Sequence, residues 1–248
     1  LKILEMLYES GLPTNRCCFV MPESLELATK LVKDERLDFF SFIGSSKVGW
    51  FLRSQLSAGT RCALEHGGIA PTFVTKSSTL EDCCKSLTKG AFYHAGQVCV
   101  SVQRIFVHKK ILDDFLDLFK KNVSKLKVND PLLKNTDVGP LIRESEVERV
   151  DTWVSESIKN GCNLIIGGNK DSSTCYKPTI ILNPKNTDKI SQQEVFGPVA
   201  CVYEYDDFNN AIEIANSVNA SFQSSIFTND IKELLEFYEK INASAVFH

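Results

Sequence analysis

The sequence has no apolar run of the roughly 18 residues that a transmembrane helix needs. Its apolar start, residues 1–10, is interrupted by Glu5 and Glu9, and no small-residue cleavage site follows, so we expect no signal peptide. An excess of basic charge is also missing, because 28 Lys and Arg stand against 31 Asp and Glu. We therefore expect neither nucleic acid nor a membrane as a partner.

Metal-binding patterns are missing as well. The chain has no C-x-x-C pair, and its four histidines do not have zinc-finger spacing, so we predict no metal site. Cysteine is plentiful, however, with nine residues. A chain of 248 residues that is 43% hydrophobic can form a core without disulfides, and the cysteine total is odd. We therefore predict reduced thiols and a cytoplasmic location.

Helical and strand-like patterns alternate along the chain, which predicts an α/β fold with a parallel sheet and crossover helices. We predict two domains, 1–65 and 66–248, that meet near Glu65. Because the chain starts at Leu1 and stops on the apolar segment 244–248, we expect it to be part of a longer protein.

Predicted helices are marked by apolar spacing and by caps. A proline at the first turn (Pro22) and a capping box (residues 78–81) each predict a helix start, and Gly96 predicts a helix end. The predicted helices cover 1–9, 22–33, 48 onward, 80–95, 111–123 and 147–158. The predicted strands cover 17–20, 39–42, 62–64, 164–166, 179–182, 200–205, 225–227 and 245–247.

Four short segments could carry chemistry, and each has a plainer structural reading. Gly44-Ser45 lies between a strand and a helix, where it could bind phosphate or simply cap the helix. Glu65, followed by two glycines, could be a general base or a solvated loop residue.

The other two segments are equally ambiguous. Cys99 follows a glycine near a helix end, which suits a nucleophilic thiolate, although most cysteines are small buried hydrophobes. Residues 194–198 (EVFGP) place an acid and an aromatic on a Gly-Pro loop, which alone is only a turn signal.

The order and spacing of these segments resemble the signature series of the aldehyde dehydrogenase superfamily. The resemblance includes the 34-residue gap between Glu65 and Cys99 and extends to the segments at 137–142, 177–179 and 227–230. It covers essentially the whole chain. It implies a Rossmann-like portion of a cofactor domain at 1–65 and an α/β catalytic domain at 66–248 that is incomplete at its C-terminal end.

The resemblance also implies roles for individual residues. Cys99 would attack an aldehyde carbonyl, pass hydride to NAD or NADP and hold the resulting thioester. Glu65 would activate the hydrolytic water, for which a partly buried carboxylate is suited. The implied cofactor contacts are Gly44 and Ser45 at the pyrophosphate, Val48 and Gly49 at the helix start, Glu194 at the nicotinamide ribose and Phe196 near the nicotinamide ring.

Parts of the family pattern would lie outside this chain. The backbone N–H of Cys99 would supply half of an oxyanion hole, and an upstream asparagine would supply the other half. An oligomerisation strand would lie downstream, in a protein that forms a homodimer or homotetramer. We therefore predict that this chain alone is inactive toward aldehydes.

Three alternatives remain at this point. In a CoA-acylating relative, CoA rather than water would take the acyl group, but such enzymes generally lack the base that Glu65 supplies. A cysteine hydrolase would pair Cys99 with a histidine, and no histidine lies in a recognised partner motif. A non-catalytic homologue could serve as a binding protein. The sequence does not identify the aldehyde, and it does not separate NAD from NADP.

Overall fold

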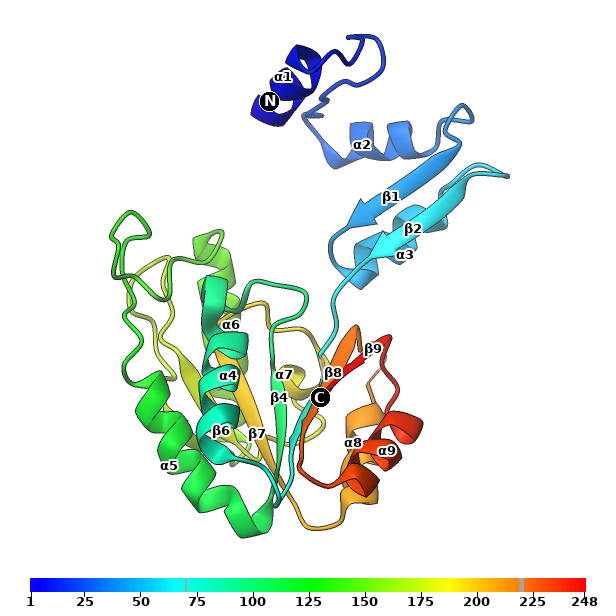
Figure 1. Cartoon of the computed structure of the whole chain (residues 1–248). Helices are drawn as coiled ribbons and strands as arrows, with labels where there is room; N and C mark the ends of the chain where they lie inside the picture. Colours follow the sequence, from blue (N-terminus) through cyan, green and yellow to red (C-terminus); the bar gives the residue numbers. More distant parts are fainter. Residues whose placement is uncertain (70, 219–220) are drawn as a thin grey trace. The chain divides into compact units, whose positions relative to one another are not determined.

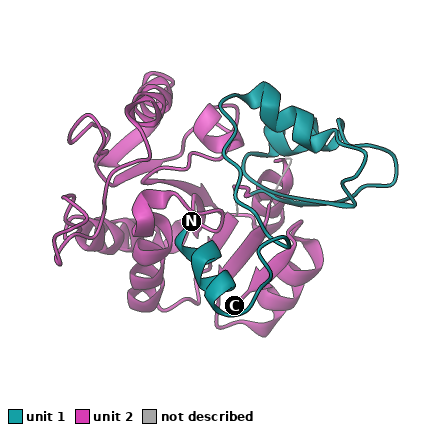
Figure 2. Cartoon of the chain, turned by 90° about the horizontal axis from the view of Figure 1, so that it is seen from above, with its two compact units in different colours: residues 1–66 teal, residues 67–248 magenta. Residues whose placement is uncertain are grey.

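The structure, a computed structural model, describes residues 1–69, 71–218 and 221–248. The chain folds into two compact units, the N-terminal unit (residues 1–66) and the C-terminal unit (residues 67–248), which Figure 2 colours separately. Both combine helices with parallel strands, and the predicted α/β fold class is confirmed. The functional assignment of residues 1–65 and 66–248 stays a prediction. None of the described helices is long and apolar enough to cross a membrane.

The N-terminal unit is a short β–α–β arrangement preceded by two helices (Figure 1). The two strands pair in parallel, from Phe39 opposite Arg61 to Ile43 opposite Glu65. A helix connects them, as parallel pairing requires. The elements are α1 (Lys2–Glu9), α2 (Leu25–Val32), β1 (Phe39–Ile43), α3 (Ser46–Arg53) and β2 (Arg61–Glu65).

Two predictions for this unit are wrong. Residues 17–20 form no strand, because within residues 1–66 the strands β1 and β2 pair only with each other. Pro22 does not open α2, which begins at Leu25. The helix is capped instead by Ser24, whose hydroxyl accepts a hydrogen bond from the Leu27 N–H at 3.3 Å. The serine hydroxyl can accept a hydrogen bond from an N–H of the first turn, whereas a proline side chain has no acceptor for it.

The C-terminal unit contains a seven-stranded sheet in the order β5-β6-β7-β4-β3-β8-β9. All neighbouring strands pair in parallel except β5 and β6, which are antiparallel. The strands are β3 (Pro71–Val74), β4 (Arg104–His108), β5 (Asn163–Ile166), β6 (Thr179–Leu182), β7 (Val199–Tyr205), β8 (Gln223–Phe227) and β9 (Ala245–Phe247).

Helices cover both faces of this sheet (Figure 1). On one face α4 and α5 pack together, and on the other Phe73 of β3 contacts Phe208 of α8 and Phe237 of α9 at ring distances of 5.6 and 5.1 Å. The helices are α4 (Leu80–Phe92), η1 (Tyr93–Gly96), η2 (Lys109–Ile111), α5 (Leu112–Val123), α6 (Glu144–Lys159), α7 (Lys189–Gln192), α8 (Phe208–Asn216) and α9 (Ile231–Lys240).

The sequence pattern missed the centre of this sheet. Strands β3 and β4 carry almost wholly buried residues, so they lack the alternation that reveals a half-exposed strand. Helices α7, α8 and α9 were also not predicted. The expected capping box is wrong, because Ser78 donates its hydroxyl to the Phe227 carbonyl at 2.6 Å, and Thr79 occupies the cap position without a side-chain hydrogen bond.

Candidate active site

Solvent exposure separates Cys99 from most of the other cysteines. All nine are free and lie in the described residues, and only Cys18 and Cys99 are exposed. Burial raises the pKa of Cys83 to about 11 and that of Cys84 to about 12, so both stay protonated at neutral pH. These two behave as small core residues. Cys99 is the exposed cysteine of the C-terminal unit and is therefore a plausible nucleophile.

Cys99 lies on a tight turn five residues before β4 begins at Arg104. The turn closes with a hydrogen bond from the Ser101 N–H to the Val98 carbonyl at 2.9 Å, and Gln223 donates to the Val100 carbonyl at 2.9 Å. Among the described residues, no hydrogen bond uses the backbone N–H of Cys99. That N–H is therefore available to a ligand.

The chain reaches this turn through an unusual backbone. Helix α4 ends at Phe92 rather than near Gly96 as predicted, because His94 and Ala95 adopt left-handed angles with φ of 50° and 55°. Of the four non-glycine residues with positive φ in the described chain, three lie at this site, Phe196 being the third with φ of 47°. Such conformations cost about 1–3 kcal/mol each and concentrate at functional sites.

The loop that carries Glu194 lies directly against the Cys99 segment. A Cβ atom on Gly96 would come within 2.1 Å of the Gly197 carbonyl oxygen, so the two loops touch backbone to backbone. A Cβ atom on Gly67 would lie 2.1 Å from Oε1 of Glu194 and 3.1 Å from Cα of Cys99. Gly67 thus brings Cys99 and Glu194 together, which gives one glycine of the Glu-x-Gly-Gly segment a steric explanation.

These three segments all enter the sheet at its amino edge. Gly67 precedes β3, Cys99 precedes β4 and Glu194 precedes β7, and these strands are neighbours in the order β7-β4-β3. Ligands in open α/β sheets usually bind outside the carboxyl ends of the strands. The candidate site is therefore placed at the opposite edge from that rule.

Side-chain amides fix the two loops relative to each other. Gln103 donates to the carbonyls of Ile190 and Gln193 and accepts from the Val195 N–H, each at 2.8 Å, so it holds the peptide groups on both sides of Glu194. Because Gln103 lies four residues after Cys99, it links the two loops directly.

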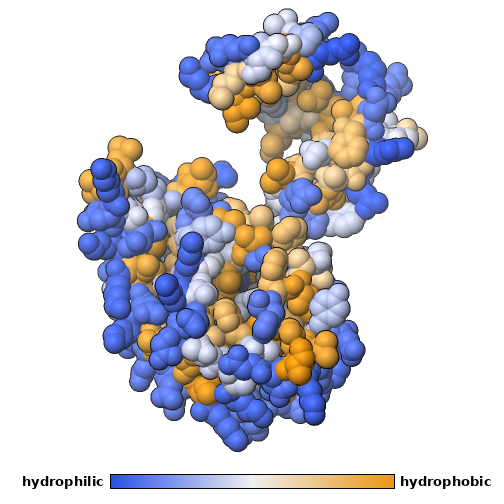
Figure 3. Space-filling view, viewed as in Figure 1, coloured by the Kyte–Doolittle hydropathy of each residue, from blue (hydrophilic) through white to orange (hydrophobic). Residues whose placement is uncertain are grey.

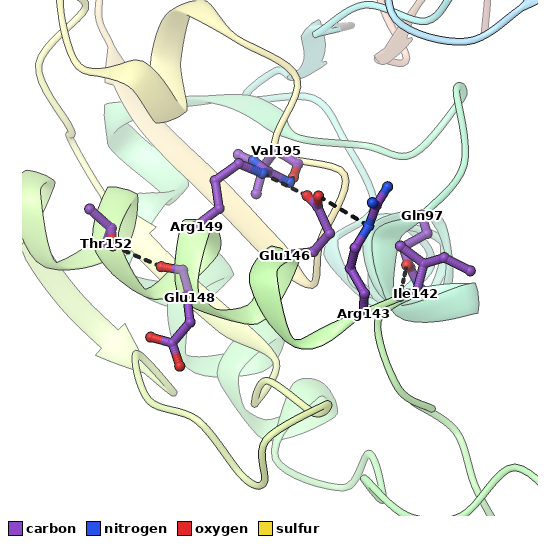
Figure 4. Close-up of polar contacts among 8 residues, drawn as sticks. All are labelled: Gln97, Ile142, Arg143, Glu146, Glu148, Arg149, Thr152 and Val195. Atoms are coloured by element: carbon purple, nitrogen blue, oxygen red, sulfur yellow. Dashed lines mark hydrogen bonds and ion pairs between the residues drawn. The ribbon is translucent and has the colours of Figure 1, made fainter. Parts of the chain in front are cut away.

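Two further residues connect helix α6 and the segment before it, residues 140–142, to the site (Figure 4). Gln97 accepts from the Ile142 N–H at 2.9 Å and donates to the Pro140 carbonyl at 3.1 Å. Arg149 of α6 donates to the Val195 carbonyl at 2.7 Å and pairs with Glu146 at 2.8 Å. No local sequence pattern predicted these roles of Gln97, Gln103 and Arg149, because each contacts residues distant in sequence.

Burial dominates the electrostatics of Glu194. Loss of solvent raises the pKa of its carboxyl group from 4.5 to about 7, while the nearby Arg149 acts in the opposite direction. Its Oε1 is buried and has no hydrogen-bond partner among the described residues. Phe196, two residues on, is 41% exposed. The Glu194 carboxyl group and the exposed Phe196 ring therefore lie on one loop, an arrangement compatible with a polar, planar ligand.

The other predicted site residues lie in the N-terminal unit. Ser45 caps α3 by accepting from the Val48 N–H at 3.4 Å, and its contact with a phosphate stays a prediction. Gly44 and Gly49 pack against the Phe42 ring, where added Cβ atoms would approach it to 2.6 and 3.1 Å. Gly44 also donates its N–H to the Glu65 carbonyl at 3.2 Å, which brings these two predicted residues together.

Glu65 ends β2 and is exposed in the structure. Its role as a general base stays a prediction. Among the described residues, no cluster of three or more His, Cys, Asp and Glu side chains could hold a metal ion.

Comparison with known proteins places this geometry in a family. The model of the aldehyde dehydrogenase family matches residues 1–248. The chain therefore belongs to the aldehyde dehydrogenase family, as the resemblance of its motifs implied.

Individual relatives agree with this assignment. The chain is 36% identical over 247 residues to the 3-sulfolactaldehyde dehydrogenase of Priestia aryabhattai, covering 99% of this chain and 51% of that protein. A glyceraldehyde-3-phosphate dehydrogenase from Methanocaldococcus jannaschii, complexed with NADP, superimposes with a TM-score of 0.92 and 34% identity, covering 99% of this chain and 53% of that one. Betaine aldehyde dehydrogenase from Staphylococcus aureus, in complex with NAD⁺, gives a TM-score of 0.93 and 25% identity over 99% and 50%. The chain spans about half the length of these relatives.

Proposed function

We propose that this chain forms the thiol-bearing part of an NAD(P)-dependent aldehyde dehydrogenase, in which Cys99 is the nucleophile in the oxidation of an aldehyde to a carboxylic acid by NAD(P). The observation that carries the proposal is the position of Cys99. It is exposed on a fixed turn, its N–H is free among the described residues, and Gly67 holds it beside Glu194. An exposed thiol beside an available N–H can form and stabilise a tetrahedral adduct.

The chemistry at Cys99 follows from this arrangement. Its thiolate sulfur bonds to the aldehyde carbon, and the carbonyl π electrons move to oxygen, where the Cys99 N–H can stabilise the charge. Loss of hydride from that carbon restores the C=O bond and leaves a thioester on Cys99. Water then adds to the thioester, and the C–S bond breaks to release the carboxylic acid and the free thiol.

NAD or NADP would accept the hydride when bound. The carboxyl group of Glu194 and the exposed ring of Phe196 fit a ribose hydroxyl and a nicotinamide ring. In the N-terminal unit, the start of α3 offers backbone N–H groups to a phosphate. The proposed contacts there are Gly44, Ser45, Val48 and Gly49.

We assign the hydrolytic step to Glu65. A carboxylate can take a proton from water as the water attacks the thioester. The assignment follows the family motif, in which an acid precedes two glycines, here Gly67 and Gly68. By the same family pattern, we propose residues 1–65 as the cofactor-binding portion and residues 66–248 as the catalytic portion. A cytoplasmic homodimer or homotetramer is the proposed setting of the whole protein.

Acylation of the thiol tests the proposal on this chain. With the activated ester p-nitrophenyl acetate, we expect acetyl transfer to Cys99 at least about tenfold faster than to the exposed Cys18, because a nucleophilic cysteine is activated by its surroundings. Peptide mass spectrometry locates the acetyl group. Cys99→Ser should remove the fast phase and Cys18→Ser should leave it unchanged. Equal labelling of the two cysteines would contradict the proposed nucleophile.

A second measurement separates the roles of Glu65 and the nucleotide. In Glu65→Gln the acetyl-thioester at Cys99 should persist about 10²-fold longer, as expected for loss of a general base. On the full-length protein, a panel of glyceraldehyde 3-phosphate, 3-sulfolactaldehyde and betaine aldehyde with NAD and NADP, followed at 340 nm, identifies substrate and cofactor. Reduction that is unchanged in Cys99→Ser would refute the mechanism.

A further inference from the structure

A small cavity lies in the C-terminal unit, between the turn that carries Cys99 and the loop that carries Glu194. Its volume is about 10 Å³, and its lining includes Gly96, Ser101, Glu194 and Gly197. Beside it, Gly96 and Gly197 touch backbone to backbone, and Gly67 packs against Glu194 Oε1. The cavity is therefore part of the fold and does not depend on the position of the N-terminal unit.

Two buried oxygen atoms belong to side chains that line this cavity. Oε1 of Glu194 and Oγ of Ser101 are both shielded from solvent, and neither has a hydrogen-bond partner within residues 1–69, 71–218 and 221–248. Buried polar groups in folded proteins are nearly always hydrogen-bonded, to protein or to ordered water. Two such atoms on one cavity therefore indicate a shared partner.

The neighbouring side chains cannot supply that partner. The amide of Gln103, which also lines the cavity, is occupied by Ile190, Gln193 and Val195. Arg149 uses its guanidinium on Glu146 and the Val195 carbonyl. A cavity of this volume holds about one water molecule and nothing larger.

We propose that this cavity binds a single water molecule that joins Ser101 Oγ to Glu194 Oε1, which makes Ser101 a positioning residue for Glu194. The water donates one hydrogen bond to the Glu194 carboxylate. It either donates a second hydrogen bond to the Ser101 hydroxyl oxygen or accepts one from the Ser101 hydroxyl. It holds the carboxyl group in one orientation from behind, while Gln103 holds the flanking peptide groups. The water site does not depend on the proposed function. Only the expectation that a fixed Glu194 binds the nucleotide rests on that function.

The charge state of Glu194 reports on this water. Burial raises the pKa of the carboxyl group to about 7, and Arg149 is the charged group that opposes it. A donated hydrogen bond favours the carboxylate over the acid. Removing the serine hydroxyl weakens the hold on the water, so the pKa of Glu194 should then rise.

The test uses this chain with two matched substitutions. Ser101→Ala removes the hydroxyl beside the cavity. Ser157→Ala removes another buried, unpartnered serine hydroxyl, on α6, that does not line the cavity. A crystal structure that resolves ordered water should show one within hydrogen-bond distance of both oxygens, and Ser101→Ala should lose it. NMR of ¹³C-labelled glutamate should show the Glu194 pKa higher by about 1 in Ser101→Ala, and unchanged in Ser157→Ala.

Several outcomes would overturn the proposal. One is a wild-type map that shows buried water elsewhere and none in this cavity. Another is a Glu194 pKa that is equal in Ser101→Ala and wild type, or that rises equally in Ser157→Ala. Failure of the full-length protein to bind NADH or NADPH, with the water present, would instead contradict the proposed function and leave the water site standing.

Discussion

The N-terminal and C-terminal units are built from similar βα elements, yet they bury very different amounts of apolar surface. In residues 1–66, Val32 is the one large hydrophobic side chain that is fully buried. The C-terminal unit has a continuous core that runs through its sheet and both helix layers. Of the 25 large hydrophobic residues exposed in the described chain, 15 lie in the first 66 residues, and Figure 3 shows apolar residues on this surface.

The difference indicates where the stability of each unit originates. Burial contributes about 25 cal/mol per Å² of apolar surface, so the C-terminal unit has a large stabilising term of its own. The N-terminal unit depends more on helix caps and on the β1–β2 pairing. The proposed nucleophile and Glu194 lie in the well-packed unit, whereas Glu65 and the proposed phosphate contacts lie in the other.

One tryptophan in each unit makes the comparison measurable. Trp50 lies in α3 of the N-terminal unit and Trp153 in α6 of the C-terminal unit, and the sequence has no others. Trp50→Phe and Trp153→Phe backgrounds therefore report the unfolding of one unit each by fluorescence in urea. We expect Trp50 to report the earlier transition. Coincident transitions would show that the two units unfold together.

The largest effect is expected from Phe73→Ala. Phe73 is fully buried and contacts the rings of Phe106, Phe208 and Phe237. Its loss leaves a cavity and should lower the free energy of unfolding reported by Trp153 by about 3–5 kcal/mol. Phe39→Ala in β1, where the ring is 55% exposed, is the control and should cost less than about 1 kcal/mol. Similar costs would show that the cores differ less than their burial indicates.

Arg104→Met should have the next largest effect. The buried guanidinium of Arg104 donates to the carbonyls of Ala215 and Ile214 at the end of α8, at 3.0 and 2.9 Å. Methionine fills the space but leaves both carbonyls without this donor, while the cost of burying the charge disappears. We expect a net loss of about 2 kcal/mol in the Trp153 transition. An unchanged free energy of unfolding would show that the buried charge of Arg104 does not stabilise the C-terminal unit.

A pH-dependent effect of about 1–2 kcal/mol is expected at Glu194, after allowing for its partial exposure. Its pKa is about 7 in the folded chain against an ordinary 4.5, so the folded state binds the proton more tightly. This contribution to stability is fully present below pH 4.5 and is lost as the pH rises through 7. Glu194→Gln should remove the pH dependence, so wild type should fall relative to the variant across this window. Parallel profiles would refute the raised pKa.

The smallest effect concerns matched helix caps. Ser45 caps α3 and Asp207 caps α8, each accepting from a backbone N–H of the first turn. Ser45→Ala and Asp207→Ala should each cost about 1 kcal/mol. The first should shift only the transition reported by Trp50, and the second only that reported by Trp153. Movement of both transitions by either variant would reveal coupling between the units.

The sequence predicted the elements that carry a clear pattern. Strands 179–182 and 245–247 coincide with β6 and β9, and the α/β class was correct. Strands β3 and β4 were missed because uniform burial removes alternation, and the helix end at Phe92 was missed because left-handed angles at His94 and Ala95 have no sequence signature.

The candidate site was predictable in part. Motif order singled out Cys99 and Glu194, and the structure places both against Gly67. The residues that hold them, Gln103 and Arg149, could not be found from local sequence, because each bonds to a loop far along the chain.

The site at the amino edge of the sheet is assembled from segments that are far apart in sequence, and this separation sets the order in which it forms during folding. Gly67, Cys99 and Glu194 enter three adjacent strands, β3, β4 and β7, that are far apart in sequence. Contacts between distant segments form slowly, because a long loop must close first. A nascent chain that has emerged only as far as α6 therefore carries the Cys99 thiol without Glu194 beside it. The surroundings of the proposed nucleophile are therefore completed late in folding, when β7 joins β4.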